Sequence, residues 1–134
     1  MSRPENWTVR ELRPGDQIRV KHKTFHHHGL YEGDGMVIHF AGPDSATLTD
    51  AAKVEVRRDT LDQFSMGRNI EVRDFSLTER LRRHSTKKIL DNARSRLGEK
   101  GYDLLHNNCE HFVTCCLFGK AVSTQIDDLR KMLP

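Results

Sequence analysis

The residues with the clearest chemical potential lie in the stretch NNCEHFVTCCLFG, residues 107–119. Its apolar side chains recur at helical spacing and Gly119 is a suitable C′ residue, so the stretch predicts a short buried helix. With Asn108 as the N-cap, Cys109 lies in the first turn, where free backbone N–H groups and the helix dipole favour a thiolate. A catalytic thiolate also needs a base, so we expect folding to bring a histidine to Cys109.

The candidate bases lie in a histidine-rich hairpin near the N-terminus, where two short apolar stretches flank a glycine-rich loop at residues 33–35. A three-residue loop places His27 and His39 diagonally on one face of the sheet, within side-chain reach. His26 and His28 then point to the other face. A two-residue loop would shift the parity and separate His27 from His39, and we favour the three-residue loop.

The other elements follow from local patterns. Alternating apolar residues predict strands at 17–20, 53–56 and 69–73, whereas residues 1–13 and 57–69 show no clear pattern. A capping-box pattern opens a helix at Ser76, and further helices are expected at 86–97 and 124–133, with an extended segment at 101–106. These elements indicate an α+β domain in which an antiparallel sheet packs against a few helices.

The length, net charge, cysteine count and apolar runs of the chain limit the class of protein. The chain of 134 residues fits one domain, and its net charge of +3 does not call for nucleic acid as a partner. Three cysteines, two of them adjacent, suggest no disulfide framework and favour a reducing compartment. The first residues lack a secretory apolar core, and no apolar run approaches the ~20 residues of a membrane span. We therefore expect a soluble, cytoplasmic protein.

Two blocks, HHHGLYEGDGMVIHFAG and NNCEHFVTCCLFGKAVSTQ, closely resemble the lecithin:retinol acyltransferase (LRAT) family, which includes the H-rev type phospholipase A/acyltransferases. The resemblance covers roughly residues 14–125 of a single domain, 1–134. It implies a circularly permuted papain-like or NlpC-like fold without a cofactor or metal. Carried over residue by residue, it implies Cys109 as the nucleophile, His27 as the general base and His39 as the residue that orients His27.

The resemblance also implies a reaction. Cys109 would take an acyl group from a phospholipid or another acyl ester as a thioester, and then pass it to water or to an acceptor. The chain departs from the family at His28, where many members carry an aromatic residue. Several animal members also have a C-terminal membrane anchor, which is absent up to Pro134, so we expect either a soluble enzyme or a longer natural chain.

The sequence is open to three alternative interpretations. A zinc site would use the consecutive histidines, but neighbouring strand residues point to opposite faces and no CxxC or HxxxH spacing supports them. A permuted papain-like isopeptidase or amidase also pairs an early histidine with a late cysteine, although Glu110 and the HHGLYEGDG block favour an acyltransferase. A catalytically inactive binding module is the third, against which the intact Cys109, His27 and His39 argue.

Basic residues suggest how a lipid substrate would be met. Seven lie in one helical region: Arg80, Arg82, Arg83, Lys87, Lys88, Arg94 and Arg96. They predict peripheral, charge-assisted contact with an anionic membrane surface. A solvated helix face is the alternative interpretation.

Overall fold

The computed structural model describes residues 6–22, 25–43, 51–103, 108–120 and 131. Within them, six strands form one antiparallel sheet in the order β1-β6-β2-β3-β4-β5. The strands are β1 (Asn6–Thr8), β2 (Gln17–His22), β3 (Phe25–Gly33), β4 (Met36–Ala41), β5 (Glu55–Thr60) and β6 (Glu71–Asp74). The α+β class predicted from the sequence is confirmed.

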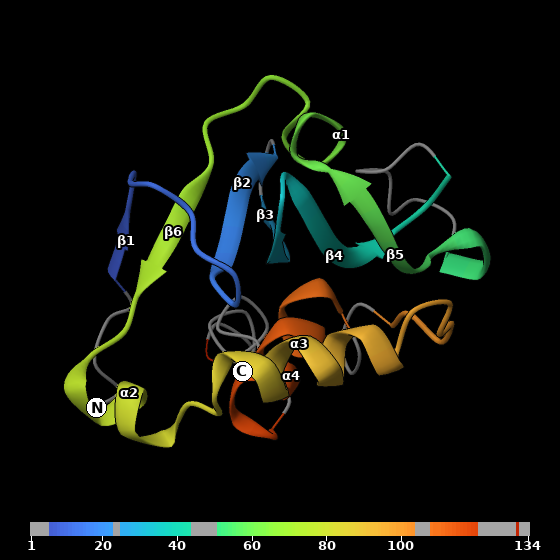
Figure 1. The fold of residues 1–134 in the computed structure, drawn as a ribbon. Coiled ribbons are helices and arrows are strands. Elements are labelled where there is room, and N and C mark those ends of the chain that lie inside the picture. Colours follow the sequence, from blue (N-terminus) through green and yellow to red (C-terminus); the bar gives the residue numbers. More distant parts are fainter. Residues whose placement is uncertain (1–5, 23–24, 44–50, 104–107, 121–130, 132–134) are drawn as a thin grey trace.

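Helices cover both sides of this sheet. They are the 3₁₀ turn η1 (Ala51–Lys53) and the helices α1 (Leu61–Ser65), α2 (Leu77–Arg82), α3 (Thr86–Ser95) and α4 (Cys109–Phe118). Figure 1 shows α3 and α4 together on one side of the strands and the short α1 on the other. None of the helices in the described ranges is both long enough and apolar enough to cross a bilayer.

Each side of the sheet has its own buried cluster. On the side of α3 and α4, apolar residues of β3, β4 and β5 pack against residues of the two helices: Leu30, Ile38, Phe40 and Val56 from the strands, and Ile89, Phe112 and Leu117 from the helices. The opposite face buries a smaller set around α1: Ile18, Val20, Val37, Phe64 and Val72. Fully burying such a side chain stabilises the fold by roughly 1.5–3 kcal/mol. The sheet is therefore fixed from both sides, and its central strands are buried on both faces.

The hairpin turn differs from the expected one. β3 and β4 are joined by the two-residue turn Asp34-Gly35, in which both residues have positive φ, as a type I′ turn requires. A bulge between Tyr31 and Gly33 adds one residue to β3. The three-residue loop was therefore wrong, but the bulge restores the parity that it implied. Leu30 pairs with Ile38, as in the predicted register.

Three elements were not expected from the sequence. β1 lies within residues 1–13, α1 lies within residues 57–69, and η1 includes Lys53, so the strand predicted at 53–56 begins at Glu55 instead. The helix at Ser76 begins with the predicted capping box, since Ser76 and Glu79 each accept the other's backbone N–H. The predicted helix at 124–133, apart from residue 131, and residues 104–106 of the predicted extended segment lie outside the described residues.

Candidate active site

The local sequence sets the start of α4. The Asn108 side chain accepts the His111 N–H at 2.9 Å, and His111 Nδ1 accepts the Asn108 N–H at 3.1 Å, which forms a reciprocal cap. Gly119 ends the helix in the left-handed conformation. Both predicted helix ends are confirmed. This capping places Cys109 at the first helical position, where its side chain is 3% exposed.

The Cys109 sulfur lies against the backbone of β3. Pairing between β3 and β4 runs from the turn as far as Leu30 and Ile38. β2–β3 pairing continues to Phe25, and β4–β5 pairing continues to Ala41. Beyond Leu30 the backbone N–H of His28 donates to the Cys109 sulfur. The sulfur thus lies next to the peptide that joins His27 to His28.

The two predicted site histidines meet on the face that carries Phe64. His27 Nε2 lies 2.8 Å from His39 Nδ1, and both side chains are fully buried. The predicted shared face is confirmed. Phe64 packs on both rings, with centroids 5.2 Å from His27 and 5.3 Å from His39. A side chain at Gly29 would come within 2.7 Å of Phe64, so glycine at this position lets Phe64 approach the strand.

A third member of this group escaped the sequence analysis. Asp59 on β5 accepts a hydrogen bond at 2.8 Å from His39 Nε2 and is itself buried. Asp59 pairs with Val37 across β4 and β5, which aligns it with the face that carries His39. The signal that could have located it is the capping box of Thr60 and Gln63, which marks the end of β5 directly after Asp59.

The thiol is not a thiolate at rest. Burial raises the pKa of Cys109 to about 12, although backbone N–H groups of His28, Glu110 and Cys109 itself hydrogen-bond to the sulfur and lower it. The lowered thiol pKa expected from the helix start alone was therefore wrong, because burial outweighs the N–H groups. Burial, with His39 as the next cause, also holds the pKa of His27 well below its usual value. Both groups are neutral at pH 7.

His27 offers one nitrogen for chemistry. Its Nε2 is engaged with His39, whereas its Nδ1 is buried and has no hydrogen-bond partner among the described residues. Buried polar atoms usually have a partner, and each exception calls for an explanation, of which a catalytic role is one. His27 directly precedes His28, whose backbone N–H binds the Cys109 sulfur.

His28 occupies the face of β3 turned toward α4. Its Nδ1 lies 3.2 Å from Gln17 Nε2, its ring contacts the edge of Trp7, and its Nε2 is 4.0 Å from a Glu110 oxygen. Burial lowers the pKa of His28 to about 4, with Glu110 opposing the shift. Polar contacts thus accommodate a histidine where many family members carry an aromatic residue.

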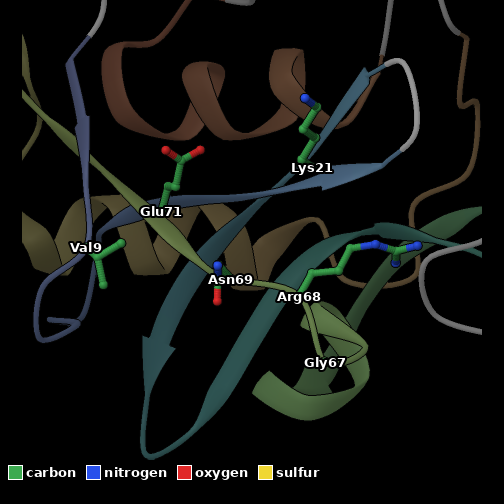
Figure 2. A pocket seen from close by; sticks show the side chains of 6 residues that line it. All are labelled: Val9, Lys21, Gly67, Arg68, Asn69 and Glu71. Carbon is green, nitrogen blue, oxygen red and sulfur yellow. The ribbon is translucent and has the colours of Figure 1, made fainter.

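A surface pocket of about 650 Å³ lies elsewhere, lined by Val9, Lys21, Gly67, Arg68, Asn69 and Glu71. Figure 2 shows Arg68 turned away from Lys21 and Glu71, so the charged ends do not converge on one point. Glu71 is also held by Arg19 at 3.0 Å. None of the site residues lines this pocket, and it does not compete with the buried group as the candidate site.

Comparison with known proteins identifies the family. A sequence profile described as Lecithin retinol acyltransferase matches residues 10–122. The lecithin retinol acyltransferase of Homo sapiens is 32% identical over 132 residues, covering 84% of this chain and 57% of that protein, and that of Rattus norvegicus is 31% identical over 133 residues with the same coverage. Phospholipase A and acyltransferase 4 of Homo sapiens is 32% identical over 126 residues, covering 87% of this chain and 76% of that protein. The chain thus spans little more than half the length of the lecithin retinol acyltransferases it matches. It belongs to the lecithin retinol acyltransferase family.

Proposed function

We propose that this protein is a cysteine-dependent acyltransferase or phospholipase A-like hydrolase that carries the acyl group of a lipid ester on Cys109. One observation carries the proposal: the Cys109 sulfur binds the His28 N–H, beside a His27 whose Nδ1 is buried without a hydrogen-bond partner among the described residues. The names of relatives at about 30% identity, acyltransferases and phospholipases A, support the same chemistry.

The pKa directions shape the first step. A raised thiol pKa and a lowered imidazole pKa disfavour a preformed thiolate–imidazolium pair, so the proton moves as the sulfur attacks. His27 Nδ1 takes the thiol proton while the S–C bond forms. The ester C–O bond then breaks, and the imidazolium returns the proton to the leaving alkoxide. The products are an alcohol and a thioester on Cys109.

The second step reverses the proton transfers. His27 takes a proton from water, or from an acceptor amine or hydroxyl, as that group attacks the thioester carbonyl. The thiolate leaves and recovers the proton from His27. Backbone N–H groups of Cys109 and Glu110, at the open start of α4, are directed at the sulfur and supply donors for the oxyanion in both steps.

Intact mass spectrometry after incubation with phosphatidylcholine vesicles tests the proposed function. We expect an increase of one acyl group in the wild-type protein and none in Cys109→Ala. Cys115→Ala is the matched control, since Cys115 is a half-buried cysteine two turns along the same helix and should leave the adduct intact. An adduct that persists in Cys109→Ala would contradict the assignment of the nucleophile. Labelling of Cys109 by a peptide-amide probe but never by lipid would identify an amidase instead.

We further propose that α2 contacts an anionic membrane surface. α2 buries none of its residues, and Leu77 and Leu81, one turn apart, are 74% and 80% exposed. Arg80 and Arg82 are exposed on the same short helix. Apolar side chains flanked by cations are the composition of helices that lie in a membrane interface.

The structure reduces the predicted basic cluster. Arg83 is half-buried and donates to the Gly15 carbonyl, Arg94 pairs with Glu32, and Arg96 pairs with Glu99. Lys87 pairs with Asp91 at 2.8 Å. These four contacts within the protein leave three residues of the cluster for a membrane: Arg80, Arg82 and Lys88.

Vesicle co-sedimentation tests this membrane contact. Each cation near an anionic surface contributes on the order of 1 kcal/mol, so Arg80→Gln with Arg82→Gln should weaken binding to phosphatidylserine-containing vesicles about thirtyfold at low salt. Leu77→Ser with Leu81→Ser should weaken it similarly. Val9→Ser and Arg68→Gln, also exposed but beside the pocket of Figure 2, are the controls. Equal binding to neutral and anionic vesicles would reject the electrostatic contact.

A further inference from the structure

The buried group on the Phe64 side of the sheet is a continuous chain of three side chains from three neighbouring strands. His27 on β3 contacts His39 on β4 at 2.8 Å, and His39 contacts Asp59 on β5 at 2.8 Å. The two histidines are 0% exposed and Asp59 is 6% exposed. A carboxylate at this depth costs free energy unless hydrogen bonds compensate it, so its position beside His39 calls for an explanation.

The donors and acceptors along this chain follow from the carboxylate. An ionised carboxylate can only accept, so His39 Nε2 carries the proton that it donates to Asp59. A neutral imidazole has one N–H, which leaves His39 Nδ1 as an acceptor. His27 Nε2 must then donate to His39 Nδ1, and His27 Nδ1 keeps its lone pair.

The electrostatics agree with this arrangement. Burial lowers the pKa of His39, and Asp59 opposes that shift through its hydrogen bond and its charge. His39 is therefore a neutral ring with a single N–H. Its hydrogen bond to Asp59 then decides which of its nitrogens faces His27 as an acceptor. When His27 becomes an imidazolium during acyl transfer, the negative charge of Asp59 lies one ring away and stabilises it.

We propose that Asp59 is a positioning residue that fixes both histidines as Nε2–H tautomers, so that His27 presents an unprotonated Nδ1 toward Cys109. The tautomer assignment stands on the geometry alone, and its catalytic consequence rests on the proposed function. Asp59 accepts a hydrogen bond throughout and takes no proton.

A purely structural role for Asp59 is the competing explanation. Arg57 approaches Asp59 with Nε 3.8 Å from the carboxylate, and Arg57 is partly exposed. An ion pair of this kind contributes little on its own. If Asp59 only served that pair, removing Arg57 would reproduce the effects of removing Asp59, so Arg57→Gln is the matched control.

Imidazole ¹H–¹⁵N correlation spectra of the ¹⁵N-histidine-labelled protein test the tautomers directly, without any substrate. We expect His27 and His39 of the wild type to be Nε2–H tautomers. In Asp59→Asn the two histidines should no longer both be Nε2–H tautomers, whereas in Arg57→Gln they should remain so. An Nδ1–H tautomer of His39 in the wild type would overturn the proposal, and this measurement requires no variant to fold. Unchanged tautomers in a folded Asp59→Asn protein would overturn it as well.

The rate of thioester formation tests the consequence. In Asp59→Asn the turnover number should fall at least about 100-fold with KM unchanged, in the range that general-base catalysis contributes. The apparent pKa on the acidic side of the pH–rate profile should also move. Arg57→Gln should retain the wild-type rate. A folded Asp59→Asn protein with altered tautomers but wild-type turnover would reject the positioning role. Failure of the wild type to form any thioester would reject the proposed function and leave the tautomer result standing.

Discussion

Replacing His27 with asparagine is expected to slow acylation of Cys109 about 10³-fold, because the thiol then loses the base that removes its proton. The loss should be severe since burial raises the pKa of this thiol to about 12, which leaves almost no thiolate at pH 7 without a base. Asparagine is small enough for the space beside Phe64. The substitution also removes the contact with His39 and the packing on Phe64, so the rate of acylation is compared for protein that is shown to be folded.

His26→Asn is the matched control for this change. His26 is the neighbouring residue on β3 and points to the opposite face, so its acylation rate should stay within about twofold of the wild type. Single-turnover mass spectrometry with phosphatidylcholine vesicles measures both variants. Equal losses at His26 and His27, or no loss at His27, would remove His27 from the role of base.

The protein should also lose stability in mild acid. Burial lowers the pKa of His22, His26, His27, His28 and His39 below the value of about 6.5 that they have in the unfolded chain. The unfolded state therefore binds more protons than the folded state below pH 6.5. The stabilisation is complete above pH 6.5 and falls as the pH drops toward the folded-state pKa values. For His28, with a pKa of about 4, the loss is on the order of 3 kcal/mol.

Urea unfolding at intervals between pH 7 and 4.5 measures this loss. Each histidine that protonates on unfolding adds a slope of about 1.4 kcal/mol per pH unit. In His28→Gln the slope of the free energy of unfolding against pH should be smaller by the contribution of about one proton between pH 6 and 4.5. A free energy of unfolding that stays constant over this range would show that the histidines have the same pKa in the folded and unfolded states, contrary to this prediction.

Local sequence signals predicted the helix that carries the thiol. Asn108 and Gly119 have side-chain and backbone properties that define helix ends, so the first-turn position of Cys109 followed from the sequence. The chemistry of that thiol did not follow, since its raised pKa depends on burial by parts of the chain far away in sequence. A helix start lowers the pKa of a thiol overall only where the sulfur is exposed to solvent or has a charged partner.

The shared face of His27 and His39 was predicted from a turn that the structure does not contain. The bulge between Tyr31 and Gly33 compensated for the shorter turn, so the conclusion held for a different physical reason. Asp59 was missed because its partner lies on the adjacent strand and residues 57–69 have no periodic pattern. Cross-strand contacts of this kind depend on sheet register, which a single sequence specifies weakly.

The bond between the His28 N–H and the Cys109 sulfur joins two segments from opposite ends of the described chain. The strands β2 to β5 pair with their neighbours in sequence, so their contacts can form early, whereas α4 must close a long loop before it contacts β3. During synthesis the histidine hairpin leaves the ribosome well before the thiol is made. We expect docking of α4 to be a late folding event, so the cysteine and the histidines of the proposed site come together only when α4 has packed against β3.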